Sequence, residues 1–92
     1  MKIKILSITP DRDFYLETID ATPVKGRKDV AIHHTNGRWI VTDIATGMLV
    51  GSGRTKKEAL EWFNNHIIDY ENYKSTERYQ KKLEQFKVLE NL

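Results

Sequence analysis

An Asn-Gly pair at positions 36 and 37 lies between two strand-like runs, and it constrains the fold more than any other feature of the sequence. Both residues of a two-residue hairpin loop adopt positive φ angles, which asparagine and glycine tolerate best. The flanking runs, VAIHHT at 30–35 and RWIVTD at 38–43, are rich in β-branched and aromatic residues. The sequence therefore predicts an antiparallel hairpin over these two runs.

A second turn follows this hairpin at Ala45-Thr46-Gly47 and leads into the apolar run Met48-Leu49-Val50. Glycine at the third position suits a three-residue loop that ends in a left-handed residue. We therefore expect residues 30–51 to form a three-stranded antiparallel meander. Trp39 is expected in the core on the same face as Val41, Leu49 and Ile32.

The N-terminal residues 2–6 and 14–19 also have strand character, and a turn-like segment at 10–13 separates them. We expect these two strands to pair with each other and to extend the meander to four or five strands. Residues 20–29 contain both proline and glycine, which is typical of a loop.

Two helices are predicted after the strands. Thr55 and Glu58 have the spacing of a capping box, which indicates that a first helix spans 55–73. A second helix spans 76–92, with Ser75 or Thr76 as its cap. Apolar residues fall on one face of each helix. The first stripe is Ala59, Leu60, Phe63, Ile67 and Tyr70, and the second is Tyr79, Leu83, Phe86, Leu89 and Leu92.

The predicted fold class is therefore α+β: an antiparallel sheet of four to five strands within residues 1–51, followed by two C-terminal helices. A length of 92 residues fits a single domain over 1–92. Hydrophobic content of 39% and charged content of 30% are typical of a globular protein. Without cysteine, the chain can form neither a disulfide nor a cysteine metal site.

The net charge of +2 excludes only the extremes of a strongly basic nucleic-acid binder and an acidic nucleic-acid mimic. No apolar run reaches the roughly 18 residues of a membrane span, and the first residues lack the apolar core of a signal peptide. We therefore expect a cytoplasmic protein with no membrane partner.

The segment GSGRTKKEAL at 51–60 places Arg54, Lys56 and Lys57 at a helix N-terminus, where the helix dipole disfavours cations. A solvated cap is one interpretation. The other is a phosphate contact, because free amides at a helix N-terminus bind anions and the three cations add to that field. Gly51 and Gly53 would then let the backbone approach the ligand closely. Further basic residues that form a possible second patch are Lys25, Arg27, Lys28 and Arg38.

Known catalytic patterns are absent. The spacing of a nucleotide-binding P-loop is not met before Gly53-Arg54-Thr55, and Ser52 lies in no nucleophile elbow. His33 and His34 are adjacent on a strand, so their side chains point to opposite faces and cannot readily share a metal. We therefore predict a non-enzymatic protein without cofactor or metal.

Aromatic residues on the helices are candidates for a protein interface, where tyrosine and tryptophan are enriched. Trp62 lies on the flank of the first helix, beside its apolar stripe, and is the candidate for an exposed contact. Tyr73 and Tyr79 are predicted to join Trp62 in a partner interface. The apolar stripe of the C-terminal helix is a possible homodimer seam.

The span 39–59 resembles the last strands and final helix of double-stranded-RNA-binding domains, whose helix opens Ser-Lys-Lys-x-Ala-Lys. Thr55 matches the serine, Lys56 and Lys57 match the first two lysines, and Ala59 matches the alanine. In that family the lysines contact phosphates, so the resemblance implies the same role here. The segment 36–39 with the helix start also resembles the arm-binding domains of phage integrases. The pattern Gly-x-Thr-x-x-Glu-Ala is similar to small antitoxins of the HicB type.

Two functional hypotheses follow from these features. The first is a small binding protein that docks on nucleic acid or a nucleoprotein complex through its basic helix N-terminus. The second is a stoichiometric protein inhibitor, because a small cysteine-free chain without catalytic motifs resembles phage and mobile-element proteins such as anti-CRISPR inhibitors. The partner would then be a host defence protein, bound through aromatic and apolar residues.

Overall fold

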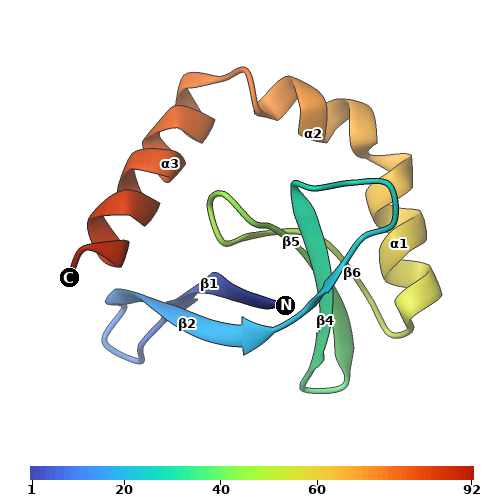
Figure 1. Cartoon of the computed structure of the whole chain (residues 1–92), viewed down its shortest axis with the longest axis horizontal. Helices are drawn as coiled ribbons and strands as arrows, with labels where there is room; N and C mark the ends of the chain where they lie inside the picture. Colours follow the sequence, from blue (N-terminus) through green and yellow to red (C-terminus); the bar gives the residue numbers. More distant parts are fainter.

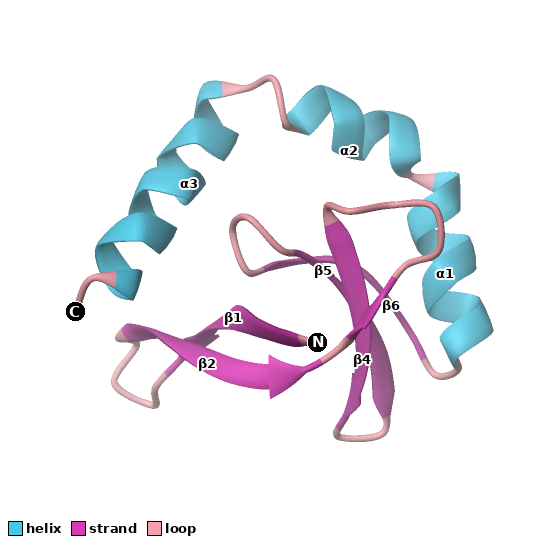
Figure 2. Cartoon of the chain, viewed as in Figure 1, coloured by secondary structure: helices cyan, strands magenta, loops and turns pink.

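The computed structural model describes residues 1–92 and has an α+β fold with two antiparallel sheets and three helices (Figures 1 and 2). The predicted fold class is confirmed, while the division into sheets and helices differs from the prediction. The strands are β1 Lys2–Ile8, β2 Phe14–Asp20, β3 Thr22–Pro23, β4 Val30–Thr35, β5 Arg38–Asp43 and β6 Met48–Gly53. The helices are α1 Lys56–Asn65, α2 Ile67–Tyr73 and α3 Glu77–Glu90.

The predicted meander is formed by β4, β5 and β6. Asn36 and Gly37 join β4 to β5 with φ angles of 49° and 75°, as a two-residue loop with two left-handed residues requires. Gly47 precedes β6 with a φ angle of 71°. The predicted two-residue loop is confirmed, whereas the predicted three-residue loop at 45–47 has four residues, 44–47, and closes with a hydrogen bond from the amide of Gly47 to the carbonyl of Asp43.

The N-terminal strands pair with each other, as predicted, but they form a separate two-stranded sheet instead of extending the meander. The chain passes from one sheet to the other at Ala21, whose small buried side chain packs with Ile3 and Ala31 in a second core between the sheets. The expected loop over 20–29 contains the two-residue strand β3, which gives the larger sheet the order β3-β4-β5-β6. Pro23 is tolerated there because β3 is an edge strand.

An irregularity in β6 overturns the prediction that Leu49 lies in the core. Val41 pairs with Gly51 and Thr42 pairs with Leu49, so Val50 is an extra residue in β6. Such a bulge shifts the alternation of side chains along the strand. Leu49 is consequently 55% exposed, while Val50 packs against the main core.

The helix predicted over 55–73 is two helices, because it breaks at His66. The backbone of His66 leaves helical geometry (φ −114°, ψ 17°), and its Nδ1 lies 2.7 Å from the carbonyl oxygen of Trp62. A side chain that bonds the carbonyl four residues earlier competes with the helical ladder. The helix predicted over 76–92 is confirmed as α3, with Thr76 as its cap.

The main core lies between the four-stranded sheet and the first two helices. It contains Val30, Ile32 and Val41 from the sheet, with Phe63 and Tyr70 from the helices among the partners. The apolar stripe predicted for 55–73 therefore faces the core. The stripe of α3 is less covered, because Tyr79 is its only buried residue and Leu92 is 93% exposed.

The three helices follow one another in an arc around the strands (Figure 1). Helix α1 packs on β6 and β5, and α3 lies against β2 at the other end of the arc. None of the helices has the length and apolar composition that a bilayer crossing requires.

Gly51 and Gly53 serve helix packing, which corrects the expectation that they expose backbone to a ligand. A Cβ atom at Gly53 would lie 2.6 Å from the backbone nitrogen of Ala59, and one at Gly51 would lie 3.2 Å from the Cβ of Phe63. Both positions are buried under α1. The glycines let the helix rest directly on β6.

We predict that Gly53→Ala lowers the free energy of unfolding by about 1–3 kcal/mol, because the contacted backbone atoms cannot move aside without shifting α1. Urea denaturation measures this change. Ser52→Ala is the matched control, because Ser52 is only half-buried and its hydroxyl contacts a surface arginine. Equal midpoints for the two variants would contradict the tight packing of α1 on β6.

His33 makes stability depend on pH. Its ring is 7% exposed, and neither ring nitrogen has a hydrogen-bond partner. Burial lowers the pKa of His33, an effect that nearby Glu17 partly opposes. The unfolded chain therefore binds a proton more readily than the folded chain, and stability falls as pH drops below the unfolded value of about 6.5.

We expect His33→Leu to flatten this dependence, which for one group cannot exceed about 1.4 kcal/mol per pH unit. Thermal unfolding of both proteins between about pH 7.5 and pH 5.5 brackets the ordinary histidine pKa. His34→Gln is the control, since His34 is exposed. The interpretation fails if the leucine variant loses as much stability on acidification as the parent protein.

Candidate nucleic-acid interface and partner surface

The predicted capping box at the start of α1 is present. Thr55 accepts a hydrogen bond from the amide of Glu58 at 3.1 Å, and the Glu58 carboxylate accepts one from the amide of Arg54 at 3.0 Å. The box places an acidic side chain at the helix N-terminus, where an anion would otherwise bind. The backbone amides alone are therefore a weak anion site.

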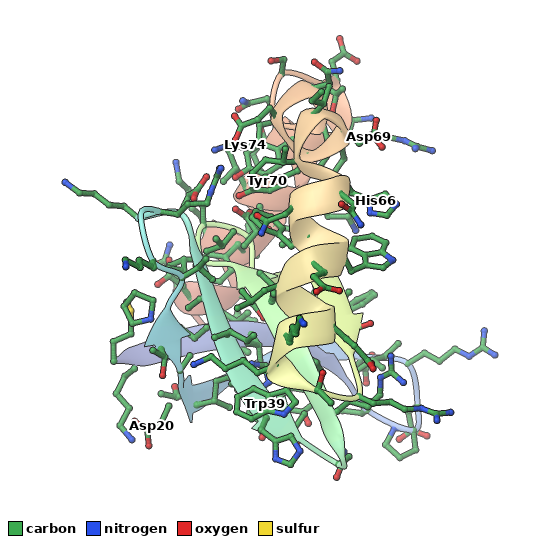
Figure 3. The ribbon with its side chains drawn as sticks, turned by 90° about the vertical axis from the view of Figure 1, so that its right-hand side faces the viewer. Asp20, Trp39, His66, Asp69, Tyr70 and Lys74 are labelled. Atoms are coloured by element: carbon green, nitrogen blue, oxygen red, sulfur yellow. The ribbon has the colours of Figure 1, made fainter.

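The basic residues of this region gather instead around the ring of Trp39. The ammonium group of Lys56 lies 6.0 Å from the centre of that ring, and the His34 ring lies 5.0 Å away on the neighbouring strand. Figure 3 shows Trp39 below the first turn of α1. We call this surface the Trp39 platform, and it consists of His34, Trp39, Arg54, Lys56 and Lys57.

Trp39 is half-buried, which confirms only part of its predicted core role. One side of the ring packs against the main core, and the remainder is exposed beside Lys56. Arg38, the preceding residue, is exposed and donates to the Ser52 hydroxyl at 3.3 Å. An aromatic ring fixed by the core and flanked by cations can stack on a base while the cations meet phosphates.

Lys57 and Arg54, on the helix side of the platform, are exposed and have almost no ion-pair partners. Lys57 has one weak partner, Glu61, at 3.9 Å, and its side chain is 85% exposed. Arg54 is exposed, and no ion pair involves its side chain. Arg54, Lys56 and Lys57 therefore lie together at the start of α1, whereas Arg38, which precedes Trp39 on β5, points to the opposite face of the sheet.

Arg27 does not belong to this surface. Its guanidinium donates to Asp29 at 2.9 and 2.7 Å and to Glu71 at 2.5 Å, and it lies 5.3 Å from the centre of the Phe63 ring. The hydrogen bonds to Asp29 hold the pKa of Arg27 above its ordinary value. Its predicted phosphate role is therefore corrected to a structural one, because its charge is already paired.

Lys28 is exposed but lies in the loop that precedes β4. That loop is at the opposite end of β4 from the Asn36-Gly37 turn, which adjoins the Trp39 platform. Lys28 is thus a separate charge, and the predicted second patch does not form, because Arg38 lies at the turn end of β5.

A buried carboxylate that the sequence did not reveal organises the other end of the sheet. Asp43, at the end of β5, is 1% exposed. Its oxygens accept hydroxyl hydrogen bonds from Thr46 at 2.6 Å, Tyr70 at 2.5 Å and Tyr79 at 3.0 Å. A buried charge is tolerated only with such partners, so this carboxylate ties α2 and α3 to the sheet.

Asp29 forms the outer half of the same network. It accepts from Arg27, from Lys74 at 2.8 Å and from the Tyr70 hydroxyl at 3.4 Å. The hydrogen bonds from Arg27, and then those from Lys74, hold the pKa of Asp29 well below its ordinary range. Burial, followed by the hydrogen bond to Asp43, raises the pKa of Tyr70.

This network contains the residue types of an acid–base catalytic site, but its carboxylates are not accessible to a substrate. Asp43 is saturated by three hydroxyl donors, and Asp29 by two cations. Neither carboxylate lines any of four hollows on the surface. A general acid or base must reach its substrate within hydrogen-bond distance, so the geometry favours a structural role.

An apolar hollow of about 390 Å³ lies between β6 and the first two helices. Residues 48–50 form one wall, and Trp62, His66 and Tyr73 are on the other. Trp62 is 45% exposed, and its ring stacks on His66 with centres 3.9 Å apart. This surface, which we call the Trp62 groove, contains two of the predicted partner contacts.

Tyr79, the third predicted contact, lies in the interior. It is 6% exposed, its hydroxyl donates to Asp43, and its ring meets the edge of Tyr73 with centres 5.5 Å apart. Burial raises the pKa of its hydroxyl. Helical periodicity correctly placed Tyr79 on the apolar face of α3. It did not show that a hydrogen bond to Asp43 would hold this face against the sheet.

Comparison with known proteins adds no family to this picture: no family model matches the chain, and neither a curated protein nor a solved structure matches it.

We predict that Tyr79→Phe lowers the free energy of unfolding by about 1.5–3 kcal/mol, because the Asp43 carboxylate loses a charge-assisted hydrogen bond without access to water. Urea denaturation measures the loss. Tyr15→Phe is the control, because Tyr15 is 44% exposed. If both variants unfold at the same urea concentration, Asp43 does not hold α3 in the way described.

Proposed function

We propose that this chain is a small non-enzymatic binding protein that docks on nucleic acid, alone or within a nucleoprotein complex, through the Trp39 platform. The observation that carries the proposal is a half-buried tryptophan ring with Lys56 and His34 beside it and the exposed Arg54 directly after the neighbouring strand β6. Stacking on the ring and charge pairing with phosphates are the two recurring modes of single-strand recognition.

The platform favours unpaired bases over an intact duplex. Bases in a duplex present only their edges in the grooves, whereas a flat ring needs an exposed base face. The Lys56 ammonium lies 6.0 Å from the centre of the ring, within reach of the phosphate of a stacked nucleotide. The double-stranded-RNA and integrase resemblances concern the same lysines and imply a duplex instead. Binding of single strands and of duplexes must therefore be compared.

The first test is charge reversal of Lys56 and Lys57 to glutamate. Acidic residues are favourable in the first turn of a helix, so this variant should remain folded. We expect binding of labelled single-stranded DNA or RNA to weaken and the salt slope to fall by about 1.4, or about 0.7 for each lost phosphate contact. Fluorescence anisotropy at several salt concentrations gives both values.

The matched control is Lys25→Glu with Lys87→Glu, which makes the same change in net charge at exposed positions away from the platform. Stacking is tested separately in Trp62→Phe, where Trp39 is the only remaining tryptophan. Its fluorescence should be quenched by a single strand and not by a duplex. Equal weakening in the lysine variant and the control would overturn the proposed interface.

A second function, stoichiometric inhibition of a protein such as a host defence component, is favoured by a different observation. The Trp62 groove exposes Trp62 and Leu49 on a concave apolar surface, and tryptophan in such pockets commonly anchors protein interfaces. Binding of this kind is largely insensitive to salt. It would persist when the lysines of the Trp39 platform are reversed.

A further inference from the structure

Strand β6 is an open edge of the larger sheet. It pairs with β5 on one side only, and none of the turn, loop and cap hydrogen bonds uses the backbone of residues 49–53. The other edge of the sheet, β3, has only two residues and ends at Pro23. An unpaired strand edge is a template for a further strand, so β6 is the edge on which one can be added.

The register identifies Ser52 as an outward-facing backbone position. The two-residue loop makes Thr35 and Arg38 a hydrogen-bonded pair, so alternate residues of β5 point their backbone groups toward β6. Trp39 is one of these, and it pairs with Gly53. The amide and carbonyl of Ser52, next to Gly53, therefore point away from the sheet.

The Trp62 groove runs alongside this edge. Met48, Leu49 and Val50 of β6 form its wall, and Trp62 faces them from α1. In a strand added to β6, every second side chain would point to the same face. Apolar side chains at those positions would enter the groove, while the backbone pairs with the edge.

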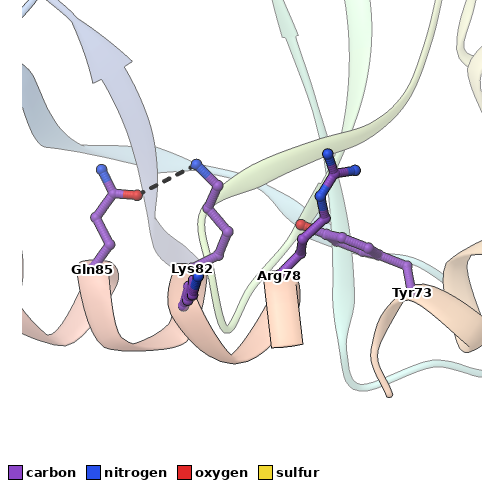
Figure 4. A pocket seen from close by; sticks show the side chains of 5 residues that line it. Tyr73, Arg78, Lys82 and Gln85 are labelled. Carbon is purple, nitrogen blue, oxygen red and sulfur yellow. Dashed lines mark hydrogen bonds between the residues drawn. The ribbon is translucent and has the colours of Figure 1, made fainter. Parts of the chain in front are cut away.

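A basic hollow of about 410 Å³ adjoins the groove at Tyr73. Tyr73 lines both hollows, and the second is otherwise lined by Arg78, Lys81, Lys82 and Gln85. Figure 4 shows Arg78 and Lys82 on one side of α3, beside Tyr73. No salt bridge involves these cations, so an acidic ligand would find them unpaired.

We propose that the edge of β6, the Trp62 groove and the basic hollow together bind one extended segment of a partner protein, apolar at first and acidic toward its C-terminal end. This proposal specifies the ligand of the second proposed function, which is protein binding through the Trp62 groove, and it rests on that function. Backbone pairing with β6 supplies affinity, and the groove and hollow supply specificity.

The direction of the segment follows from the geometry. Met48 pairs with Asp43, whose carboxylate holds Tyr70, so the Met48 end of β6 lies beside α2 and the basic hollow. β6 runs away from that end, toward Gly53. An antiparallel segment, the more stable arrangement, therefore finishes at the basic hollow.

The same charges disfavour a second copy of this chain on the edge. Antiparallel pairing of two β6 strands would bring the Met48 end of one copy to the Gly53 end of the other. Arg78 and Lys82 of one copy would then face Arg54 of the other. Like charges in an interface are costly, so the complementary occupant is acidic.

The test is selection from a library of random peptides about ten residues long, enough for a strand with short flanks. The parent protein and an Arg78→Glu, Lys82→Glu variant are used in parallel. We expect the parent to enrich peptides with alternating apolar residues followed by Asp or Glu. The variant should enrich Lys or Arg at the same place and bind the parent's peptides about tenfold more weakly.

Hydrogen exchange of the complex then reports the binding mode. The Ser52 amide should become protected when a selected peptide binds, whereas a peptide bound as a helix would leave it exchanging freely. Lys25→Glu with Lys87→Glu is again the charge control and should keep the parent's preference. Light scattering of the free protein shows whether it is a dimer, and protection of the Ser52 amide in that dimer shows whether β6 pairs with a second copy.

The outcomes test separate parts of the proposal. Apolar peptides without an acidic end would overturn the assignment of the basic hollow and leave the protein-binding function standing. No enrichment, an unprotected Ser52 amide or a β6-paired homodimer would overturn peptide binding at this edge. None of these outcomes depends on the Trp39 platform, which nucleic-acid binding tests separately.

Discussion

The Asp43 carboxylate is the contact on which the arrangement of the helices depends. It is buried at the end of β5, where Tyr70 of α2 and Tyr79 of α3 both donate to it. An unpaired charge at that position would cost several kcal/mol, so the two tyrosines and the sheet stabilise one another's positions. Without it, α3 has little to hold it, because Tyr79 is its only buried residue. The positions of α2 and α3 in the arc, and with them the Tyr73 part of the wall of the Trp62 groove, therefore depend on this carboxylate.

The two proposed binding surfaces use different chemistry at different ends of α1. The Trp39 platform adjoins its first turn and combines an anchored ring with unpaired cations. The Trp62 groove begins near its last turn and combines apolar walls with an open strand edge. Because the surfaces are separate, one chain could contact a nucleic acid and a protein at once. Such an arrangement suits the proposed docking on a nucleoprotein complex, and the two proposed functions would depend differently on salt.

Local signals predicted much of the fold. The Asn36-Gly37 turn, the Thr55 cap and the Thr76 cap all lie where short-range chemistry places them, because each satisfies its own backbone within a few residues. The apolar stripe of the first two helices was also read correctly from its period. The prediction was wrong about Leu49 and the helix at His66, where one bulge and one side-chain contact interrupt the expected period.

The residues of the candidate sites were likewise predicted only in part. The sequence by itself determined that cations would cluster at the start of α1, since the cap fixes that start and neighbours in sequence stay neighbours in space. Only the tertiary structure decided which other residues join them. Lys56 of α1 lies over the Trp39 ring of β5, whereas Arg27 pairs with Asp29 and Glu71 and is not available to a ligand. The burial of Asp43, the interior position of Tyr79 and the groove beside β6 likewise arise from contacts distant in sequence. Residue type and spacing do not encode such contacts, because they form only when the helices pack on the sheet.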